Sequence, residues 1–227
     1  MISDCKPLLA PSLLSADFYN MKPQIETIEK SGVKILHLDV MDGHFVPSIS
    51  YGMPVIAAIR KCTDLIFDTH LMITDPDRYL ADFANAGADI ITVHIEACDD
   101  PAATLTTIKT LGKKAAIAIN PPTDLSEILP YLPYCDMALV MSVNPGFGGQ
   151  KYIDSVTSKI AALAEYRTQH GLCFDIEVDG GISPSNAGMV MDAGADILVA
   201  GSAVFKGDIA SNIQAFNEVF NDKTCSK

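Results

Sequence analysis

The 227-residue sequence has no tryptophan and is poor in basic residues, with 16 Lys and Arg against 28 Asp and Glu. The formal charge of -12 at pH 7 repels phosphodiester backbones, and no basic cluster is larger than a pair such as Lys113-Lys114. No apolar run approaches the ~18 residues of a membrane span, and the first residues lack the basic and apolar regions of a secretory signal. We therefore expect a cytoplasmic protein that binds neither nucleic acid nor membrane.

Other absences narrow the chemistry. The six cysteines are scattered without a C-x-x-C pair, so we expect reduced, mostly buried thiols. No Gly-x-Ser-x-Gly string supplies a serine nucleophile, and no Gly-x-Gly-x-x-Gly string follows the first predicted strand to bind a nicotinamide nucleotide. Lys34 and Lys114 lie at strand starts rather than strand ends, which argues against a Schiff-base aldolase.

The sequence contains a short internal repeat. Ala86-Gly-Ala-Asp-Ile-Ile-Thr-Val93 recurs as Ala193-Gly-Ala-Asp-Ile-Leu-Val-Ala200, with a weaker copy over residues 31–38. In each copy a helical pattern ends at a glycine, which can cap a helix, and a short β-branched run follows. This repeat therefore predicts that a connection from a helix to a buried strand recurs along the chain.

The same alternation extends along the whole chain, with no linker or charge block to interrupt it. The predicted strands are 8–11, 35–40, 65–70, 90–95, 115–119, 137–142, 175–179 and 196–200, and the predicted helices are 17–30, 53–61, 76–86, 101–111, 124–131, 152–169, 184–193 and 208–221. We expect residues 1–227 to form a single α/β domain.

The positions of the polar residues distinguish a barrel from a doubly wound open sheet. An open sheet concentrates its site at one crevice, whereas a closed barrel gathers residues from all strands at one mouth. Polar residues occur at or just beyond the ends of many predicted strands: Ser12, His37, Asp39, His70, His94, Asn120, Ser142, Asn144, Asp179 and Ser202. This distribution favours a (β/α)8 TIM barrel.

Two histidines and two aspartates form the main candidate site. Alternate residues of a strand face the same way, so His37, Asp39 and Met41 point together, while His70 and Asp179 lie at the ends of two other strands. A single histidine on an apolar strand would more often be a hydrogen-bonded core residue. Four ionisable groups at one level are costly to bury without pairing or a metal, so we predict a divalent-cation site.

Three consecutive loops are rich in glycine. The candidate residues are Gly146, Phe147, Gly148 and Gly149 after the sixth strand, Gly180 and Gly181 after the seventh, and Gly201 and Ser202 after the eighth. Each loop alone could be an ordinary turn. Three together expose backbone N–H groups at one part of the mouth, which predicts a phosphate-binding site.

Three methionines adjoin the strand-end polar residues. Met41, Met72 and Met141 could be core filler, but at these positions we expect an apolar lid that excludes water without offering a competing proton donor.

These parts suggest chemistry on a small phosphorylated sugar. A cation can hold a carbonyl and an adjacent hydroxyl and stabilise an enediolate, while one carboxylate on each face removes or returns a proton. This combination describes an epimerase, although the same parts could serve an isomerase or an aldol-type lyase.

At these residues the chain resembles the ribulose-phosphate 3-epimerase family. The resemblance covers roughly residues 8–220. It is carried by Ala10-Pro-Ser-Leu-Leu-Ser-Ala-Asp-Phe18, His37-Leu-Asp-Val-Met-Asp-Gly-His-Phe-Val-Pro47, Asp68-Thr-His-Leu-Met72, Met141-Ser-Val-Asn-Pro-Gly-Phe-Gly-Gly-Gln150, Glu177-Val-Asp-Gly-Gly-Ile182 and Val199-Ala-Gly-Ser202.

The resemblance implies a ribulose-phosphate-binding barrel that interconverts D-ribulose 5-phosphate and D-xylulose 5-phosphate in the pentose phosphate pathway. The family pattern places the metal ligands on His37, Asp39, His70 and Asp179, and the acid/base pair on Asp39 and Asp179. It places sugar contacts on Ser12 and His70, and phosphate contacts on the glycine loops with Ser202. One divalent ion of Zn, Fe, Mn or Co is implied, and we expect a homo-oligomer.

Three alternatives remain to be compared. A 3-epimerase of a hexulose 6-phosphate, such as allulose 6-phosphate, would tend to vary the glycine loop, whereas Gly148-Gly149 keeps the pentulose form. The related decarboxylases and hexulose-phosphate synthases need a D-x-K-x-x-D signature, and Met41 occupies its lysine position. A non-catalytic sugar-phosphate sensor would have no reason to keep both Asp39 and Asp179.

Overall fold

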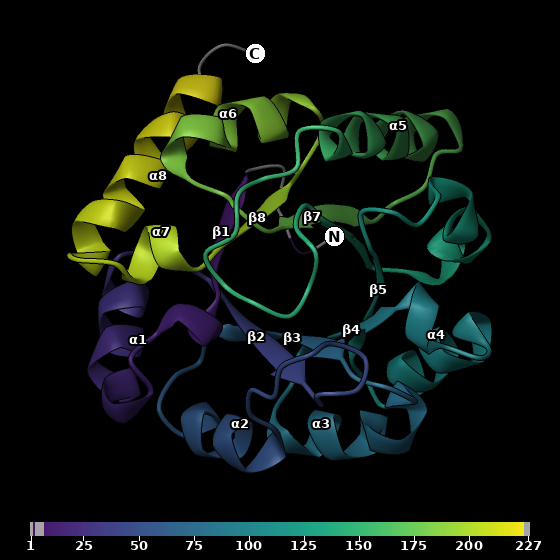
Figure 1. Cartoon of the computed structure of the whole chain (residues 1–227), viewed down its shortest axis with the longest axis horizontal. Coiled ribbons are helices and arrows are strands. Elements are labelled where there is room, and N and C mark those ends of the chain that lie inside the picture. Colours follow the sequence, from purple (N-terminus) through teal and green to yellow (C-terminus); the bar gives the residue numbers. More distant parts are fainter. Residues whose placement is uncertain (1, 3–6, 225–227) are drawn as a thin grey trace.

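Eight parallel strands form a ring with the helices outside it (Figure 1). The computed structural model describes residue 2 and residues 7–224. The strands are β1 (Leu8–Pro11), β2 (Ile35–Met41), β3 (Ile66–Met72), β4 (Ile90–His94), β5 (Lys114–Ile119), β6 (Met137–Met141), β7 (Asp175–Asp179) and β8 (Ile197–Ala200). Hydrogen-bonded neighbours follow the order β1-β8-β7-β6-β5-β4-β3-β2. The predicted (β/α)8 barrel is confirmed.

The ring closes between β1 and β2 through one isolated bridge. β1 pairs along all four of its residues with β8, but meets β2 only through the parallel bridge between Ser12 and His37. Pro11 has no N–H group to donate to a neighbouring strand, which weakens this seam. The bridge joins two of the predicted site residues.

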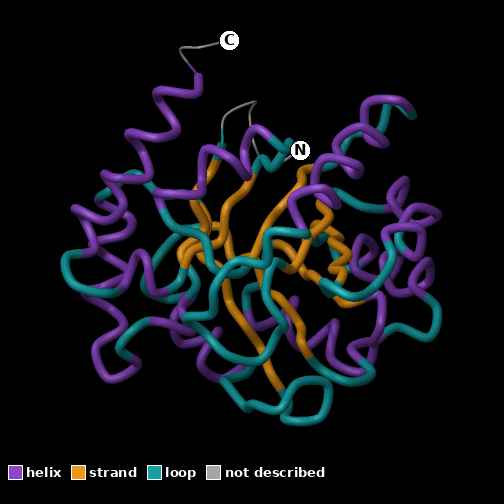
Figure 2. The backbone as a smooth tube through the Cα atoms, turned by 45° about the horizontal axis from the view of Figure 1, so that its top comes forward, coloured by secondary structure: helices purple, strands orange, loops and turns teal. Residues whose placement is uncertain are grey.

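The helices surround the strands in both views (Figures 1 and 2). The α-helices are α1 (Met21–Lys30), α2 (Met53–Arg60), α3 (Leu80–Ala86), α4 (Pro101–Thr110), α5 (Val156–Gln169), α6 (Pro184–Asp192), α7 (Ser202–Phe205) and α8 (Ile209–Thr224). The 3-10 helices are η1 (Leu13–Ser15), η2 (Phe18–Asn20), η3 (Pro76–Tyr79), η4 (Ile95–Ala97), η5 (Leu125–Glu127) and η6 (Leu129–Tyr134). No described helix is both long and apolar enough to cross a membrane.

The predicted helix over 124–131 is wrong in type. This segment forms η5 and η6 instead of one α-helix. Pro130 is the second residue of η6, and Pro133 lies inside it. Since proline lacks an N–H group and its ring clashes with the preceding turn, a regular α-helix is broken here.

The segment after β6 also differs from the prediction. The helix expected from residue 152 begins at Val156, because the Ile153 N–H bonds to the Ser142 carbonyl at 2.9 Å. Residues 142–155 therefore form a long green loop that lies over the centre of the ring in Figure 1. The short helix α7, which the sequence analysis did not predict, begins directly after β8.

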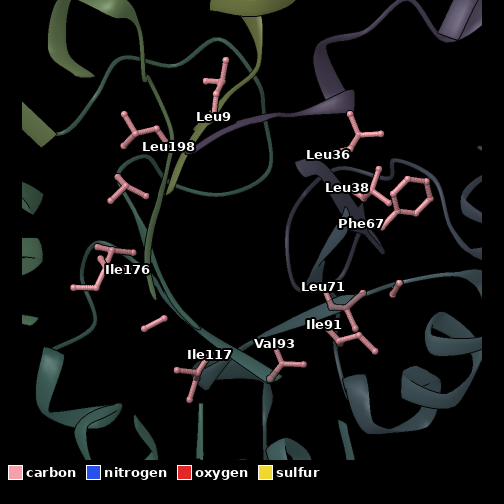
Figure 3. Packing of buried hydrophobic residues seen from close by; sticks show 14 of the residues in the cluster. Leu9, Leu36, Leu38, Phe67, Leu71, Ile91, Val93, Ile117, Ile176 and Leu198 are labelled. Atoms are coloured by element: carbon pink, nitrogen blue, oxygen red, sulfur yellow. The ribbon is translucent and has the colours of Figure 1, made fainter. Parts of the chain in front are cut away.

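The main hydrophobic core lies between the ring and the helices. On β2, Leu36 and Leu38 join this core, whereas His37 and Asp39 alternate with them and face the interior. Figure 3 shows side chains of this core around the ring of strands, among them Leu9, Phe67 and Ile176. A second apolar cluster, which includes Ile35, Ile90 and Ile197, fills the lower interior of the barrel. The polar residues at the strand ends therefore lie above an apolar layer inside the barrel.

The four cysteines within the described residues are all free thiols. Cys135 is buried and Cys98 is half-buried, but Cys62 and Cys173 are exposed, so the expectation of mostly buried cysteines is wrong for these two. Cys5 and Cys225 lie outside the described residues.

Candidate active site

Four side chains from three strands converge at the barrel mouth. His37 and Asp39 come from β2, His70 from β3 and Asp179 from β7, and one ligand atom of each lies within 4.8 Å of the others. His37 Nε2 is 3.4 Å from His70 Nδ1 and 3.4 Å from Asp39 Oδ1. Asp39 Oδ1 is 3.3 Å from His70 Nδ1, and Asp179 Oδ2 is 3.9 Å from each histidine nitrogen. The structure thus brings the predicted cation ligands together.

These spacings fit a divalent cation. Ligand atoms ~2.0–2.1 Å from a tetrahedrally coordinated ion lie about 3.3–3.4 Å from one another. The three distances among His37, Asp39 and His70 have this length, and Asp179 is slightly farther. The group can hold a metal ion with two nitrogen and two oxygen donors.

Asp39 is fixed through both carboxylate oxygens. Its Oδ2 accepts a hydrogen bond from Ser12 Oγ at 2.5 Å, which leaves Oδ1 facing the two histidines. The Asp39 carbonyl accepts a further bond from Ser50 Oγ at 2.6 Å. Ser12 therefore braces Asp39, an arrangement that the sequence analysis did not foresee.

The two aspartates have opposite pKa shifts. Burial acts to raise the pKa of Asp39, but the charge of His37 and hydrogen bonds from both histidines lower it well below its usual range. Burial, reinforced by the Asp39 charge, raises the pKa of Asp179 to about 7. The protein groups alone thus favour a charged Asp39 and a protonated Asp179 in weak acid.

The histidines also differ from each other. Burial opposes the charged form of His37, but the carboxylates of Asp68 and Asp39 raise its pKa well above the usual value. For His70, burial dominates over the hydrogen bond with Asp39 and lowers the pKa to about 4. His70 is therefore neutral at pH 7, with one nitrogen free to act as a ligand.

Two buried acids below the site were missed in the sequence analysis. Asp68 Oδ2 lies 2.5 Å from His37 Nδ1 and orients that ring. Glu177 is fully buried, neither of its oxygens has a hydrogen-bond partner, and burial and the Asp68 charge raise its pKa well above normal. Each acid lies two residues before a predicted ligand on the same strand, so the period-two pattern could have identified both.

A cavity of about 540 Å³ opens above the four side chains. His37 and His70 are buried beneath it, with no exposed surface. All other predicted site residues line it: Ser12, Asp39, Met41, Met72, Met141, Gly146, Phe147, Gly148, Gly149, Asp179, Gly180, Gly181, Gly201 and Ser202. Ser15, Ser183 and Lys206 also line the cavity and were not predicted.

The glycine loops form one wall of this cavity, but for different reasons. Gly181 has φ +65°, and a Cβ there would collide with the backbone of Lys151 and Tyr152. Gly148 has no such strain, and a Cβ would meet only Ser15 Oγ, at 3.6 Å. A side chain at Gly148 would therefore extend into the cavity with little disturbance of the fold.

The methionines form an apolar wall beside the aspartates. Met41 and Met72 are paired across β2 and β3 and pack with Val46, while Met141 lies opposite Asp179 on the neighbouring strand. All three are nearly fully buried and line the cavity. They belong to the walls of the cavity rather than to a cover, and the exclusion of water expected of the predicted lid stays a prediction.

Comparison with known proteins identifies the family. The family model described as the ribulose-phosphate 3 epimerase family matches residues 8–205. The chain belongs to the ribulose-phosphate 3-epimerase family. Among its relatives, the Synechocystis protein named ribulose-phosphate 3-epimerase is 50% identical over 200 residues, covering 87% of both chains. The Bacillus subtilis protein of the same name is 48% identical over 198 residues, covering 87% of this chain and 91% of that one.

More distant structures share the barrel. The 3-hexulose-6-phosphate synthase from Salmonella typhimurium superposes with a TM-score of 0.71 at 20% identity, covering 95% of this chain and 99% of that one. This likeness shows the fold alone. The predictions of a ribulose-phosphate 3-epimerase family member and of an enzyme of the epimerase type are confirmed.

Proposed function

We propose that this chain interconverts D-ribulose 5-phosphate and D-xylulose 5-phosphate, with Asp39 and Asp179 as the two groups that transfer the proton at C3. The proposal rests on one observation. Asp39 and Asp179 come from strands that are not neighbours, and their carboxyl groups meet in the same cluster of side chains beside the cavity. The names of the relatives support the substrate.

A divalent ion of Zn, Fe, Mn or Co would be held by His37, Asp39, His70 and Asp179. When bound, it would supply positive charge that lowers the free energy of an enediolate form of the sugar. The two-nitrogen, two-oxygen donor set is compatible with each of these ions, so the identity of the metal stays open.

The two aspartates provide the acid and the base. Asp39 is held charged and braced by Ser12, so it can accept the C3 proton from one face of the sugar. Asp179 is 16% exposed toward the cavity, and its raised pKa suits a group that returns a proton to the other face. In the reverse direction the two residues exchange roles.

The remaining cavity residues bind and shield the sugar. The loops with Gly146–Gly149, Gly180–Gly181 and Gly201–Ser202 can present backbone N–H groups to the phosphate. Ser12 would contact the sugar, and the methionines would exclude water. His70 was also expected to contact the sugar, but it is buried beneath the cavity with no exposed surface, so we keep only its role as a cation ligand. Phe147 is 58% exposed at the rim, where it can cover a bound substrate.

Two further expectations stay predictions. We propose a homo-oligomer in the cytoplasm, although the relatives do not share one compartment, since the Arabidopsis thaliana protein is named as chloroplastic.

The assay that tests the function compares two substrates on metal-loaded protein. We expect fast epimerisation of D-ribulose 5-phosphate and much slower turnover of D-allulose 6-phosphate. Preference for the hexulose phosphate would support the alternative epimerase, and binding of either sugar phosphate without turnover would support a non-catalytic sensor.

A further inference from the structure

His70 contacts a third histidine on the side away from the cation-binding group. Its Nδ1 faces Asp39 and His37, whereas its Nε2 lies 2.8 Å from Nε2 of His94, the last residue of β4. The ring planes differ by 26° and the centroids are 4.9 Å apart. The two nitrogens therefore lie between the rings, as in an in-plane hydrogen bond. Both imidazoles are fully buried.

The hydrogen bond continues from His94 to Glu96. His94 Nδ1 lies 3.1 Å from Glu96 Oε2, and the other oxygen, Oε1, accepts bonds from the Asn120 N–H at 2.9 Å and Thr123 Oγ1 at 2.6 Å. The Glu96 side chain is 23% exposed, so the chain of contacts runs from the buried site to the protein surface. Burial acts to raise the pKa of Glu96, but bonds from His94, Thr123 and Asn120 lower it to about 2. Glu96 is therefore an acceptor at both oxygens.

The loop that supplies these donors is itself anchored. Lys159 Nζ on α5 donates to the carbonyls of Asn120, Pro121 and Thr123 at 3.0, 2.9 and 2.6 Å. The loop after β5 thus holds the Glu96 carboxylate in place, and Lys159 on α5 holds that loop.

Asp39 at one end of these contacts and Glu96 at the other can both only accept a proton, and the shorter contact, 3.1 Å at Glu96 against 3.3 Å at Asp39, favours one arrangement of protons. Since Glu96 can only accept, a His94 ring that carries one proton holds it on Nδ1, and its Nε2 then accepts. His70 then carries its proton on Nε2, which leaves the Nδ1 lone pair free toward the cation-binding group. In the other tautomer His70 would donate from Nδ1 to Asp39 Oδ1, 3.3 Å away, and that lone pair would be lost.

We propose that His94 and Glu96 are positioning residues that hold His70 in the tautomer able to bind a cation through Nδ1. The proposal deepens the proposed function, because it rests on His70 as a ligand. The two ligand histidines are then held differently. His37 is oriented directly by Asp68, whereas His70 is oriented by a carboxylate acting through a second imidazole.

The substitution Glu96→Gln reverses the proton arrangement while keeping the shape of the side chain. If the Gln oxygen keeps its bonds from Asn120 and Thr123, its NH2 group points at His94 Nδ1. His94 must then carry its proton on Nε2, and His70 must move its own proton to Nδ1. We expect Co²⁺ binding, measured by chelator competition and by the visible absorption of the ion, to weaken about 10- to 100-fold. Asp99→Asn, at another carboxylate in the same surface hollow, is the matched control and should bind Co²⁺ like the wild type.

A second pair of variants distinguishes loss of the hydrogen bond from misfolding. His94→Gln places an amide oxygen near the position of Nε2 and can still accept from His70, whereas His94→Met has similar bulk and no such acceptor. We expect the Gln variant to retain Co²⁺ affinity within a few-fold and the Met variant to lose about 10- to 100-fold. Equal affinities for these two variants would contradict the proposal.

Nitrogen-15 spectra of the histidine rings in metal-free protein give a readout that needs neither metal nor activity. The proposal predicts a proton on His70 Nε2 in the wild type and on His70 Nδ1 in Glu96→Gln. The same tautomer in both proteins would overturn it. Failure of the wild type to bind Co²⁺ would instead refute the metal centre of the proposed function, and the ring spectra would still decide the role of Glu96.

Discussion

At the scale of single residues, the site depends on two aspartates with different surroundings. Asp39 receives a hydrogen bond from Ser12 and lies against two histidines, whereas Asp179 is farther from them and faces the cavity. In the proposed mechanism the same side-chain type thereby takes two roles, one as a charged base and the other as an acid. This separation follows from burial and neighbouring charge, because the chemistry of the two groups is identical.

Replacing Asp179 by Asn keeps the shape and one oxygen but removes the proton-transfer group. We expect kcat for epimerisation to fall by about 10²–10⁴, the range for loss of a positioned acid or base. Steady-state kinetics with measured metal content is the test, and Asp175→Asn, at the opposite end of β7, is the control. Near-normal turnover by metal-loaded Asp179→Asn would contradict the role of this residue.

The shifted pKa values also predict how cation binding depends on pH. Asp179 has a pKa of about 7 and that of His37 is raised, so both hold protons in weak acid that a cation must displace. Affinity should therefore decrease as pH falls from 8 to 6 and recover as it rises. Chelator competition with Co²⁺ across this range measures it, and Asp179→Asn should show a weaker dependence. Constant affinity would contradict these shifts.

Single residues were predictable where the strand pattern and the chemistry coincided. His37 and Asp39 share one strand face and lie at the strand end, so the pattern identified both. Asp68 and Glu177 lie on the same faces one step deeper, and they were missed because a buried acid without a known partner resembles no binding motif. The path from His70 through His94 to Glu96 crosses from β3 to β4, and no pattern within one strand reveals such contacts.

At the scale of elements, the loops after β6, β7 and β8 line one wall of the cavity, and the loop after β7 begins directly after Asp179. Their glycines have distinct functions, since Gly180 and Gly181 have positive φ and close neighbours, while Gly148 is unstrained and faces open space. Only Gly148 allows the phosphate contact to be tested without disturbing the loop.

Gly148→Ala should raise KM for the pentulose phosphate by about tenfold, because an added methyl group obstructs approach of the phosphate to the backbone, with a smaller effect on kcat. Thermal unfolding should be unchanged, since a Cβ there meets only Ser15 Oγ. Gly52→Ala, where a Cβ meets no atom within 4 Å, is the control. An unchanged KM would show that the phosphate lies elsewhere.

The type of an element was predictable where the hydrophobic periodicity was strong. The ends of an element were not predictable where tertiary contacts determine them. The eight strands lie close to their expected positions because each is a short apolar run. The region of η5 and η6 has a helical pattern, but its prolines exclude a continuous α-helix. The late start of α5 depends on a bond between Ile153 and Ser142, which is not encoded in local sequence.

At the scale of the whole molecule, the barrel holds the four ligands in place from strands that are far apart in the sequence. β2, β3 and β7 each contribute to the group, and the weakest seam of the ring, between β1 and β2, adjoins it. A cation shared by these strands would therefore stabilise the barrel as well as support the chemistry.

Chelation should abolish turnover and also lower the melting temperature. A ligand present at ~100 times its Kd stabilises the folded state by about 2.7 kcal/mol, which calorimetry detects readily. Adding back Zn²⁺, Mn²⁺ or Co²⁺ should restore both turnover and the melting temperature. In His37→Gln, adding these ions should change the melting temperature little. Full activity in rigorously metal-free protein would contradict the role of the cation.

The most direct test of the central claim is the origin of the hydrogen at C3 of the product. Two aspartates on opposite faces of the sugar exchange protons with solvent independently, whereas a single base would carry the same hydrogen from one face to the other. In D2O, with D-ribulose 5-phosphate as substrate and conversion kept low, we expect D-xylulose 5-phosphate that contains solvent deuterium at C3. Product that retains the substrate's own hydrogen at C3 would contradict the two-aspartate mechanism.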